Sequence, residues 1–300
     1  ERYSGHLNVN NKYKNFDLAL SGIFSLTKEK PLPGAQYYSN PMHALKFALT
    51  PSVPIYNEDG SYNKSVKELN YMNLVEENEI NTHRSRIART FASAEAGYTI
   101  LKGLRLSTVF NVDYINTNEF RYFSPESSDG RSPNGQGDFY RVENLTYNSN
   151  TRLNYAAKFG EHSVDVLAAY EIHSWDKDYA FAEAKNYATD KKNVLNVAST
   201  PVEIGNYISG DAMLSYVFRA NYDYKTRYYL SASFRRDGSS RLHPDNRGEN
   251  FCAISGSWRF SHEKFLKSCE NWLTDGKIRL SYGVNGNIPS SLYSYNGMYD

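Results

Sequence analysis

Apolar and polar residues alternate with a period of two along several stretches of the chain, and the clearest stretch begins at Ala212. Most residues between its apolar positions are polar or charged. Residues two apart lie on the same face of a β-strand, so the pattern predicts strands with one apolar and one polar face. The apolar positions are Ala212, Leu214, Tyr216, Phe218, Ala220, Tyr222 and Tyr224.

The same pattern predicts ten strands, each placed to within a few residues. Several exceed the roughly 9–11 residues with which a tilted strand crosses a bilayer, and they far exceed the ~5–6 residues usual in soluble sheets. The predicted strands cover about residues 3–11, 14–28, 84–100, 103–123, 141–159, 162–182, 209–223, 227–237, 250–261 and 276–285.

The connections between these strands alternate between short and long. Bacterial outer-membrane barrels have short periplasmic turns and long extracellular loops, so this rhythm predicts an antiparallel transmembrane β-barrel. The join at about 262–275 departs from it, because it is long and falls on the short side. The predicted long loops cover about residues 29–83, 124–140, 183–208 and 238–249.

Composition agrees with a multi-pass barrel in a bacterial outer membrane. Aromatic residues make up 15% of the chain, 26 of them tyrosine, and tyrosine suits both strands and the membrane interface. No run of 18 apolar residues predicts a membrane-crossing helix. Basic residues number 34 against 33 acidic ones and are scattered, which argues against a nucleic-acid partner.

The alternation also predicts which side chains face membrane lipid and which face the barrel lumen. The lipid-facing set is predicted to be Leu214, Tyr216, Phe218, Leu230, Phe234, Ile254 and Trp258. The lumen-facing set is predicted to be Arg219, Asn221, Ser231 and Arg235.

No spacing in the sequence favours an active site. The seven histidines and two cysteines lack metal-ligand spacing, and no nucleophile motif is present. We therefore expect no enzyme activity, no catalytic residue, no metal and no cofactor. The longest loop is unusually long for an unstructured connection and carries four tyrosines that are candidates for contacting cargo or a covering partner, with simple packing on the barrel rim as the alternative. They are Tyr37, Tyr38, Tyr56 and Tyr62.

Residues 219–287 resemble the SusC/RagA family of TonB-linked outer-membrane transporters of Bacteroidetes, and residues 1–218 resemble it more loosely. The chain departs from the family at Gly248–Cys252 and at Gly276. The most specific runs are Phe234-Arg235-Arg236-Asp237-Gly238-Ser239-Ser240-Arg241 and Lys277-Ile278-Arg279-Leu280-Ser281-Tyr282-Gly283-Val284-Asn285-Gly286-Asn287.

The resemblance implies a 22-stranded barrel with a plugged lumen, of which residues 1–300 form part of one barrel domain while the N-terminal plug and the other strands lie outside this sequence. It also implies a TonB energy-coupling protein, a SusD-like surface lipoprotein, and import of an oligosaccharide or peptide. The residues alone leave open a passive porin-type channel, which differs in having an open lumen. A soluble carbohydrate-binding β protein fits less well, because the alternation at Ala212–Tyr224 leaves a wholly apolar face.

Overall fold

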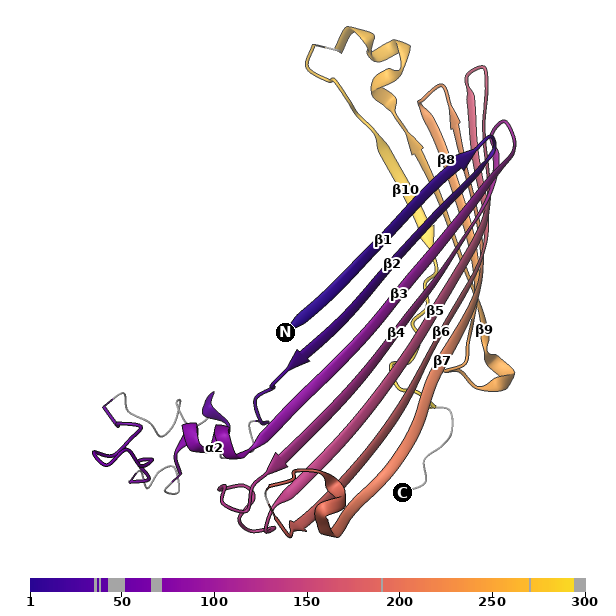
Figure 1. The fold of residues 1–300 in the computed structure, drawn as a ribbon. Helices are drawn as coiled ribbons and strands as arrows, with labels where there is room; N and C mark the ends of the chain where they lie inside the picture. The colour runs from indigo at the N-terminus through magenta and orange to yellow at the C-terminus, as the bar shows by residue number, and fades with distance from the viewer. Residues whose placement is uncertain are drawn as a thin grey trace.

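The computed structural model describes residues 1–34, 37, 39–42, 52–65, 72–189, 191–269 and 271–293, without the side chains of 267–269. Ten strands form one sheet in the order of the sequence, and each pairs antiparallel with its neighbours. Figure 1 shows this sheet as a curved wall with β1 and β10 at its two edges. The strands are β1 Arg2–Tyr13, β2 Phe16–Glu29, β3 Thr82–Leu101, β4 Leu104–Phe123, β5 Gln136–Phe159, β6 His162–Tyr187, β7 Ala198–Tyr224, β8 Tyr228–Ser239, β9 Gly248–Trp258 and β10 Ile278–Gly283.

Short turns lie at one end of the sheet and long connections at the other, which confirms the predicted rhythm (Figure 1). The predicted exception is also present, because the long β9–β10 connection lies at the end with the short turns. The turns adopt left-handed backbone at Lys14, Gly103 and Lys225, with φ of 53°, 87° and 57°. Such values let two long strands reverse within a few residues. We call the end with the long connections the wide end.

The strands β5, β6 and β7 are each longer than the alternation predicts by about five residues or more. The strand β7 differs most, because it begins at Ala198 and not near residue 209. Pro201 and Gly205 suggest a loop in the sequence. In the structure Pro201 lies beside a register shift in the β6–β7 pairing, and β8 pairs with β7 only from Met213 onward. Proline is tolerated at such edges and bulges because it lacks only a backbone donor. The phenyl ring of Phe181 covers Gly205, its cross-strand partner.

The connection between β2 and β3 contains a short helix, α2 Leu74–Ile80, which was predicted only as loop. Asn73 caps it by accepting hydrogen bonds from the backbone of Val75 and Glu76. The buried Glu77 carboxylate accepts a 2.7 Å hydrogen bond from the backbone N–H of Ser128, and burial raises its pKa. This bond joins two of the long connections at the wide end.

Short 3-10 helices complete the described elements: η2 Leu195–Val197, η3 Pro244–Asn246, η4 Phe260–His262 and η5 Lys264–Cys269. Within the described part of the chain, no helix is long and apolar enough to cross a membrane. The buried apolar cluster is small and lies at the wide end, where Phe120, Tyr122 and Tyr187 pack together. Most of the sheet is one layer thick, so its function depends on what its two faces present.

Candidate functional site

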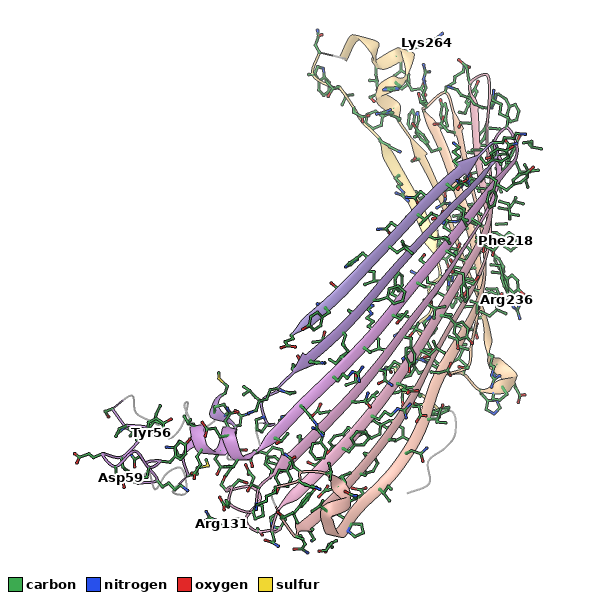
Figure 2. All side chains as sticks on the ribbon, viewed as in Figure 1. Tyr56, Asp59, Arg131, Phe218, Arg236 and Lys264 are labelled. Carbon is green, nitrogen blue, oxygen red and sulfur yellow. The ribbon has the colours of Figure 1, made fainter. Side chains whose placement is uncertain are left out.

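The first face of the sheet is apolar, and the strand register defines it. Phe218 lies opposite Ala168 in β6 and Phe234 in β8, and Phe234 lies opposite Cys252 in β9. Cross-strand partners share a face. Figure 2 shows Phe218 and Arg236 projecting from the same side of the sheet. We call this side the apolar face.

All seven residues predicted to face lipid lie on the apolar face, and each side chain is between 37% and 54% exposed. Large apolar side chains in that number are unusual on a surface in contact with water. Their contact with lipid itself stays a prediction. The seven are Leu214, Tyr216, Phe218, Leu230, Phe234, Ile254 and Trp258.

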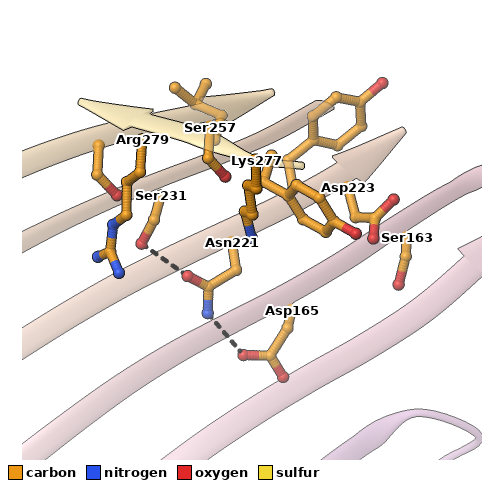
Figure 3. A pocket seen from close by; sticks show the side chains of 12 residues that line it. Ser163, Asp165, Asn221, Asp223, Ser231, Ser257, Lys277 and Arg279 are labelled. Carbon is orange, nitrogen blue, oxygen red and sulfur yellow. Dashed lines mark hydrogen bonds between the residues drawn. The ribbon is translucent and has the colours of Figure 1, made fainter. Parts of the chain in front are cut away.

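The four residues predicted to face the lumen lie together on the opposite face, which we call the polar face. Ser231 and Asn221 are cross-strand partners, and the Ser231 hydroxyl donates a 2.7 Å hydrogen bond to the Asn221 side-chain oxygen. Asn221 in turn donates to Asp165 of β6 at 3.3 Å, and Arg219 approaches the same carboxylate at 3.7 Å. Figure 3 shows the Ser231–Asn221–Asp165 chain crossing three strands.

Arg235 joins the same three strands farther along the polar face. Its guanidinium donates to the hydroxyl of Ser215 on β7 at 2.9 Å and lies 3.0 Å from the Glu171 carboxylate on β6. A third contact, at 2.6 Å, is to Asp237 on its own strand. These charge-assisted bonds keep the arginine in one orientation. The facing of this side chain toward a lumen stays a prediction.

A polar pocket of about 340 Å³ opens on this face near the short turns (Figure 3). Carboxylates of Asp165 and Asp223 line one side, and Lys277 and Arg279 of the β10 region line the other. The Lys277 ammonium lies 4.1 Å from the ring centroid of Tyr229. Among the described residues, no group of three His, Cys, Asp or Glu side chains is placed to hold a metal ion. The pocket therefore suits a polar partner surface or water.

At the wide end, the polar face carries four tyrosine rings and one arginine that we call the wide-end cluster: Tyr37, Arg121, Tyr140, Tyr179 and Tyr207. The rings of Tyr140 and Tyr179 have centroids 6.3 Å apart, and those of Tyr179 and Tyr207 are 4.9 Å apart. The Arg121 guanidinium lies 5.1 Å above Tyr140 and 5.5 Å above Tyr37. Five separate parts of the chain thus contribute to one surface.

Strand alternation sets the orientation of this cluster, since Tyr207 and Arg219 are both odd-numbered positions of β7. Tyr207 remains 50% exposed. Lys177 lies 5.5 Å from the Tyr179 ring and 5.7 Å from the Tyr207 ring. Partial burial raises the pKa of Tyr37, which lies outside the strands. The tyrosine rings of the cluster can serve as stacking surfaces, and their hydroxyls as hydrogen-bond donors.

Three carboxylates border the wide-end cluster in one cross-strand row, in which Glu183 lies opposite both Asp138 and Glu203. Gln136 donates to Asp138 at 3.3 Å and to Glu183 at 3.1 Å. The Asp138 carboxylate is buried and lies 3.2 Å from the Arg121 guanidinium. The surface thus combines rings, cations and acceptors within a few strands.

The structure separates the four loop tyrosines predicted to contact cargo or a partner. Tyr37 joins the wide-end cluster and stacks on Phe123 at 4.8 Å. Tyr56 and Tyr62 form their own pair, 5.3 Å between centroids, out on the β2–β3 connection. The Tyr62 hydroxyl donates to Glu79 at 2.6 Å, which raises its pKa to about 12. Tyr38 lies outside the described residues.

Four residues of this surface were not predicted from the sequence. Lys177 and Tyr179 are two residues apart in a predicted strand, so the sequence could have placed them on the same face. Tyr207 fell in the predicted loop at 183–208, and only the extended β7 brings it beside Tyr179. Arg121 was within a predicted strand, but nothing in its neighbourhood indicated a stacking partner.

No family model matches the chain. It is 29% identical over 255 residues to TonB-dependent receptor P3 of Formosa agariphila, covering 83% of this chain. It is 27% identical over 190 residues to TonB-dependent receptor SusC of Bacteroides thetaiotaomicron, covering 63% of this chain and 18% of SusC. The chain spans about a quarter of the length of receptor P3, 25%.

The fold resembles that of a solved transporter, the RagAB peptide importer in its open-open state, with a TM-score of 0.77 at 20% identity. The match covers 94% of this chain and 32% of that chain. The names of these proteins describe receptors and a transporter and not enzymes, in agreement with the expectation for this chain. The chain therefore belongs to the SusC/RagA-like TonB-dependent receptors, and its ten antiparallel strands are a segment of their β-barrel.

Proposed function

We propose that the full-length protein imports an oligosaccharide or a peptide across the bacterial outer membrane, using energy delivered through TonB. The observation that carries the proposal is the wide-end cluster, where rings and cations line the polar face at the end of the sheet with long connections. Relatives named TonB-dependent receptors and a neighbour titled a peptide importer support the transport class. In this proposal residues 1–300 belong to one barrel domain, and the plug and TonB-binding segment lie elsewhere.

The proposed orientation follows from the connections. The apolar face contacts lipid, the polar face lines the lumen, and the wide end lies outside the cell. A SusD-like lipoprotein then covers the wide end, with the Tyr56–Tyr62 pair and Tyr38 on the loop that meets it. The polar pocket of Asp165 and Lys277 lies at the periplasmic half, where a plug would supply polar groups.

The wide-end cluster has the chemistry to hold either cargo. Ring faces stack on the C–H faces of pyranose rings or on peptide side chains, at about 0.5–1.5 kcal/mol for a well-placed pair. Arg121 and Lys177 supply cationic donors, and Glu183 and Glu203 supply acceptors. A surface with all three features binds a flexible polar chain without demanding one sequence.

An uptake experiment tests the cluster. Cells that lack the chromosomal receptor would carry the full-length protein or its Tyr179→Ala/Tyr207→Ala variant, and uptake of a fluorescent casein-peptide digest and of labelled glucan oligosaccharides would be measured. We expect the variant to lose about tenfold in the apparent affinity for one of the two probes, in proportion to two lost stacking contacts. Tyr170→Ala, on the apolar face, is the matched control. Unchanged uptake in the variant would refute the assignment of the cluster.

A second measurement separates active import from a passive channel. Dissipating the proton gradient with a protonophore should stop uptake if TonB drives it, whereas diffusion through an open porin would continue. Deleting residues 34–66 tests the lid contact. If the barrel assembles and still captures the lipoprotein, the loop tyrosines do not form that contact.

A further inference from the structure

We infer that the apolar face carries a binding site for the phosphorylated headgroup of a membrane lipid, formed by Lys28, Arg84 and Arg86 at the wide end. The inference rests on the proposed placement of the apolar face in the outer membrane, and it goes beyond cargo import. Three features carry it: a lined cavity, cations without acidic partners, and the position of the cavity directly above an apolar band.

The cavity has a volume of about 370 Å³ and lies where β2, β3, β4 and β5 run side by side. Lys28, Arg84 and Arg86 supply its cations, and Asn118 supplies an amide. Phe120 and Phe139 supply its apolar part, and they are cross-strand partners. A charged rim beside an aromatic wall suits a ligand that is itself part anionic and part apolar.

The three cations are available to a ligand. Lys28 and Arg86 are cross-strand partners, so the two side chains project side by side, and both are exposed. Arg84 lies on the same face of β3, two residues before Arg86, and its guanidinium is 4.8 Å from the centroid of the Phe120 ring. Within the described part of the chain, none of the three has an ion-pair partner, in contrast to Arg89, which holds Asp113 at 2.6 Å.

Two acidic residues, Glu29 and Glu119, are also among the residues that border the cavity. They occupy the alternate positions of their strands, so their side chains project toward the polar face. Glu119 accepts a 2.9 Å contact from His83 there. Among the residues that line the cavity, the three cations therefore share the apolar face with no carboxylate. Glu1, whose backbone is hydrogen-bonded to that of Lys28, lies beside the cavity on this face without lining it.

The position of the cavity selects a lipid. On β2 the apolar face reads Leu18, Leu20, Phe24 and Leu26 before it reaches Lys28. On β3 the small residues Ala92 and Ala88 precede Arg86 and Arg84 in the same way. In each strand the first charged side chain thus follows the last apolar one. Cations at such a boundary lie at headgroup depth, where basic pockets recognise anionic lipids.

Arginine matches phosphate with two parallel N–H donors, and lysine adds a point charge. A headgroup phosphate seated between Arg84 and Arg86 would leave its sugar or glycerol portion against Phe120 and Phe139. The shape and charge of the site therefore point to a phosphate-bearing glycolipid or phospholipid held at the outer rim of the barrel.

The test uses the full-length receptor purified in dodecyl maltoside, with bisphosphoryl lipid A, its fully dephosphorylated form and inorganic phosphate as separate probes. Native mass spectrometry measures binding, and the thermal unfolding midpoint gives an independent readout. We expect wild-type protein to bind bisphosphoryl lipid A, and Arg84→Ala/Arg86→Ala to weaken binding at least about tenfold, because two charged hydrogen bonds are lost. Arg84→Lys/Arg86→Lys keeps both positive charges and should retain part of the affinity for lipid A. Complete loss of binding in this lysine variant would indicate misfolding.

The matched control is Arg152→Ala, which removes an exposed arginine from the opposite face of the same sheet. Equal binding of lipid A to the Ala double variant and to wild type would overturn the inference. So would equal binding of the dephosphorylated lipid, or displacement of lipid A by inorganic phosphate at equal concentration. Outer-membrane fractionation and cargo uptake are measured on the same Ala double variant. They test the proposed transport function independently of lipid binding, so a failure of the lipid site can be distinguished from a failure of that function.

Discussion

Arg105 of β4 reaches across β3 to Asp17 of β2, and its two terminal nitrogens lie 2.7 and 2.6 Å from the two carboxylate oxygens. Gly97 is the residue of β3 that lies between them, opposite Asp17 on one side and Ser107 on the other. A Cβ atom there would lie 2.7 Å from an oxygen of Asp17 and closer still to the Arg105 guanidinium. Glycine at this position leaves room for the Asp17–Arg105 ion pair, which links β2 to β4 across β3.

Gly97→Val should destabilise the barrel, because the new side chain displaces the Asp17–Arg105 pair or pushes the strands apart. Overpacking of this kind costs about 1–3 kcal/mol. The midpoint of urea unfolding of the full-length receptor in detergent would measure it. Gly5→Val is the matched control, since nothing lies within 4 Å of the Cβ it would add. If adding Arg105→Ala to Gly97→Val does not restore part of the stability, the steric explanation is wrong.

Phe218→Lys should disturb membrane insertion, because it places a charge on the proposed lipid-facing side. The expected cost is about 2–4 kcal/mol at the bilayer midplane. Val109→Lys puts the same charge on the polar face, opposite Glu95, and should cost much less. Refolding yield into lipid vesicles, followed by unfolding in urea, compares the two. Equal losses for both variants would contradict the assignment of the faces.

The β9–β10 connection depends on a pair between Arg259 and Asp275, with bonds of 2.8 and 2.9 Å. The hydrogen bonds from Arg259 lower the pKa of Asp275 from 3.8 to about 2. A lowered acid pKa stabilises the folded form above pH 3.8, and this contribution is lost as the pH falls toward 2.

Asp275→Asn should therefore speed amide hydrogen exchange across residues 259–277 at neutral pH. Wild-type protein should show the same faster exchange only when the pH falls toward the lowered pKa of Asp275. Asp245→Asn, whose carboxylate is 85% exposed, is the control. Exchange that does not differ between Asp275→Asn and wild type would show that the pair does not organise this connection.

The two cysteines should remain free thiols. Cys252 is exposed on the apolar face of β9, and Cys269 ends η5 beyond the other end of that strand. The six residues from Cys252 to Trp258 span about 20 Å at ~3.3 Å each, well beyond the ~7 Å that a disulfide allows between Cα atoms. Intact-mass measurement without reductant checks this, and a mass lower by two hydrogens would contradict it.

The period-two alternation by itself determined the number of strands, their order as simple hairpins and the two faces, because side-chain direction in a strand depends only on local backbone geometry. Phe218 and Arg219 were correctly separated without any knowledge of their neighbours. The short turns followed in the same way from residues such as Gly103. The resemblance of residues 219–287 to a transporter family pointed to the class of protein that the comparisons then showed.

Only the tertiary structure decided the length of β7 and what lies side by side across the sheet. The segment 198–208 is a strand because β6 pairs with it, although its one proline and one glycine disfavour a strand. Tyr179 and Tyr207 meet across that pairing, and Lys28 meets Arg86 across another. Asp17 and Arg105 lie 88 residues apart in the sequence. Such neighbours are set by strand register, which depends on the pairing of whole strands and not on any local pattern.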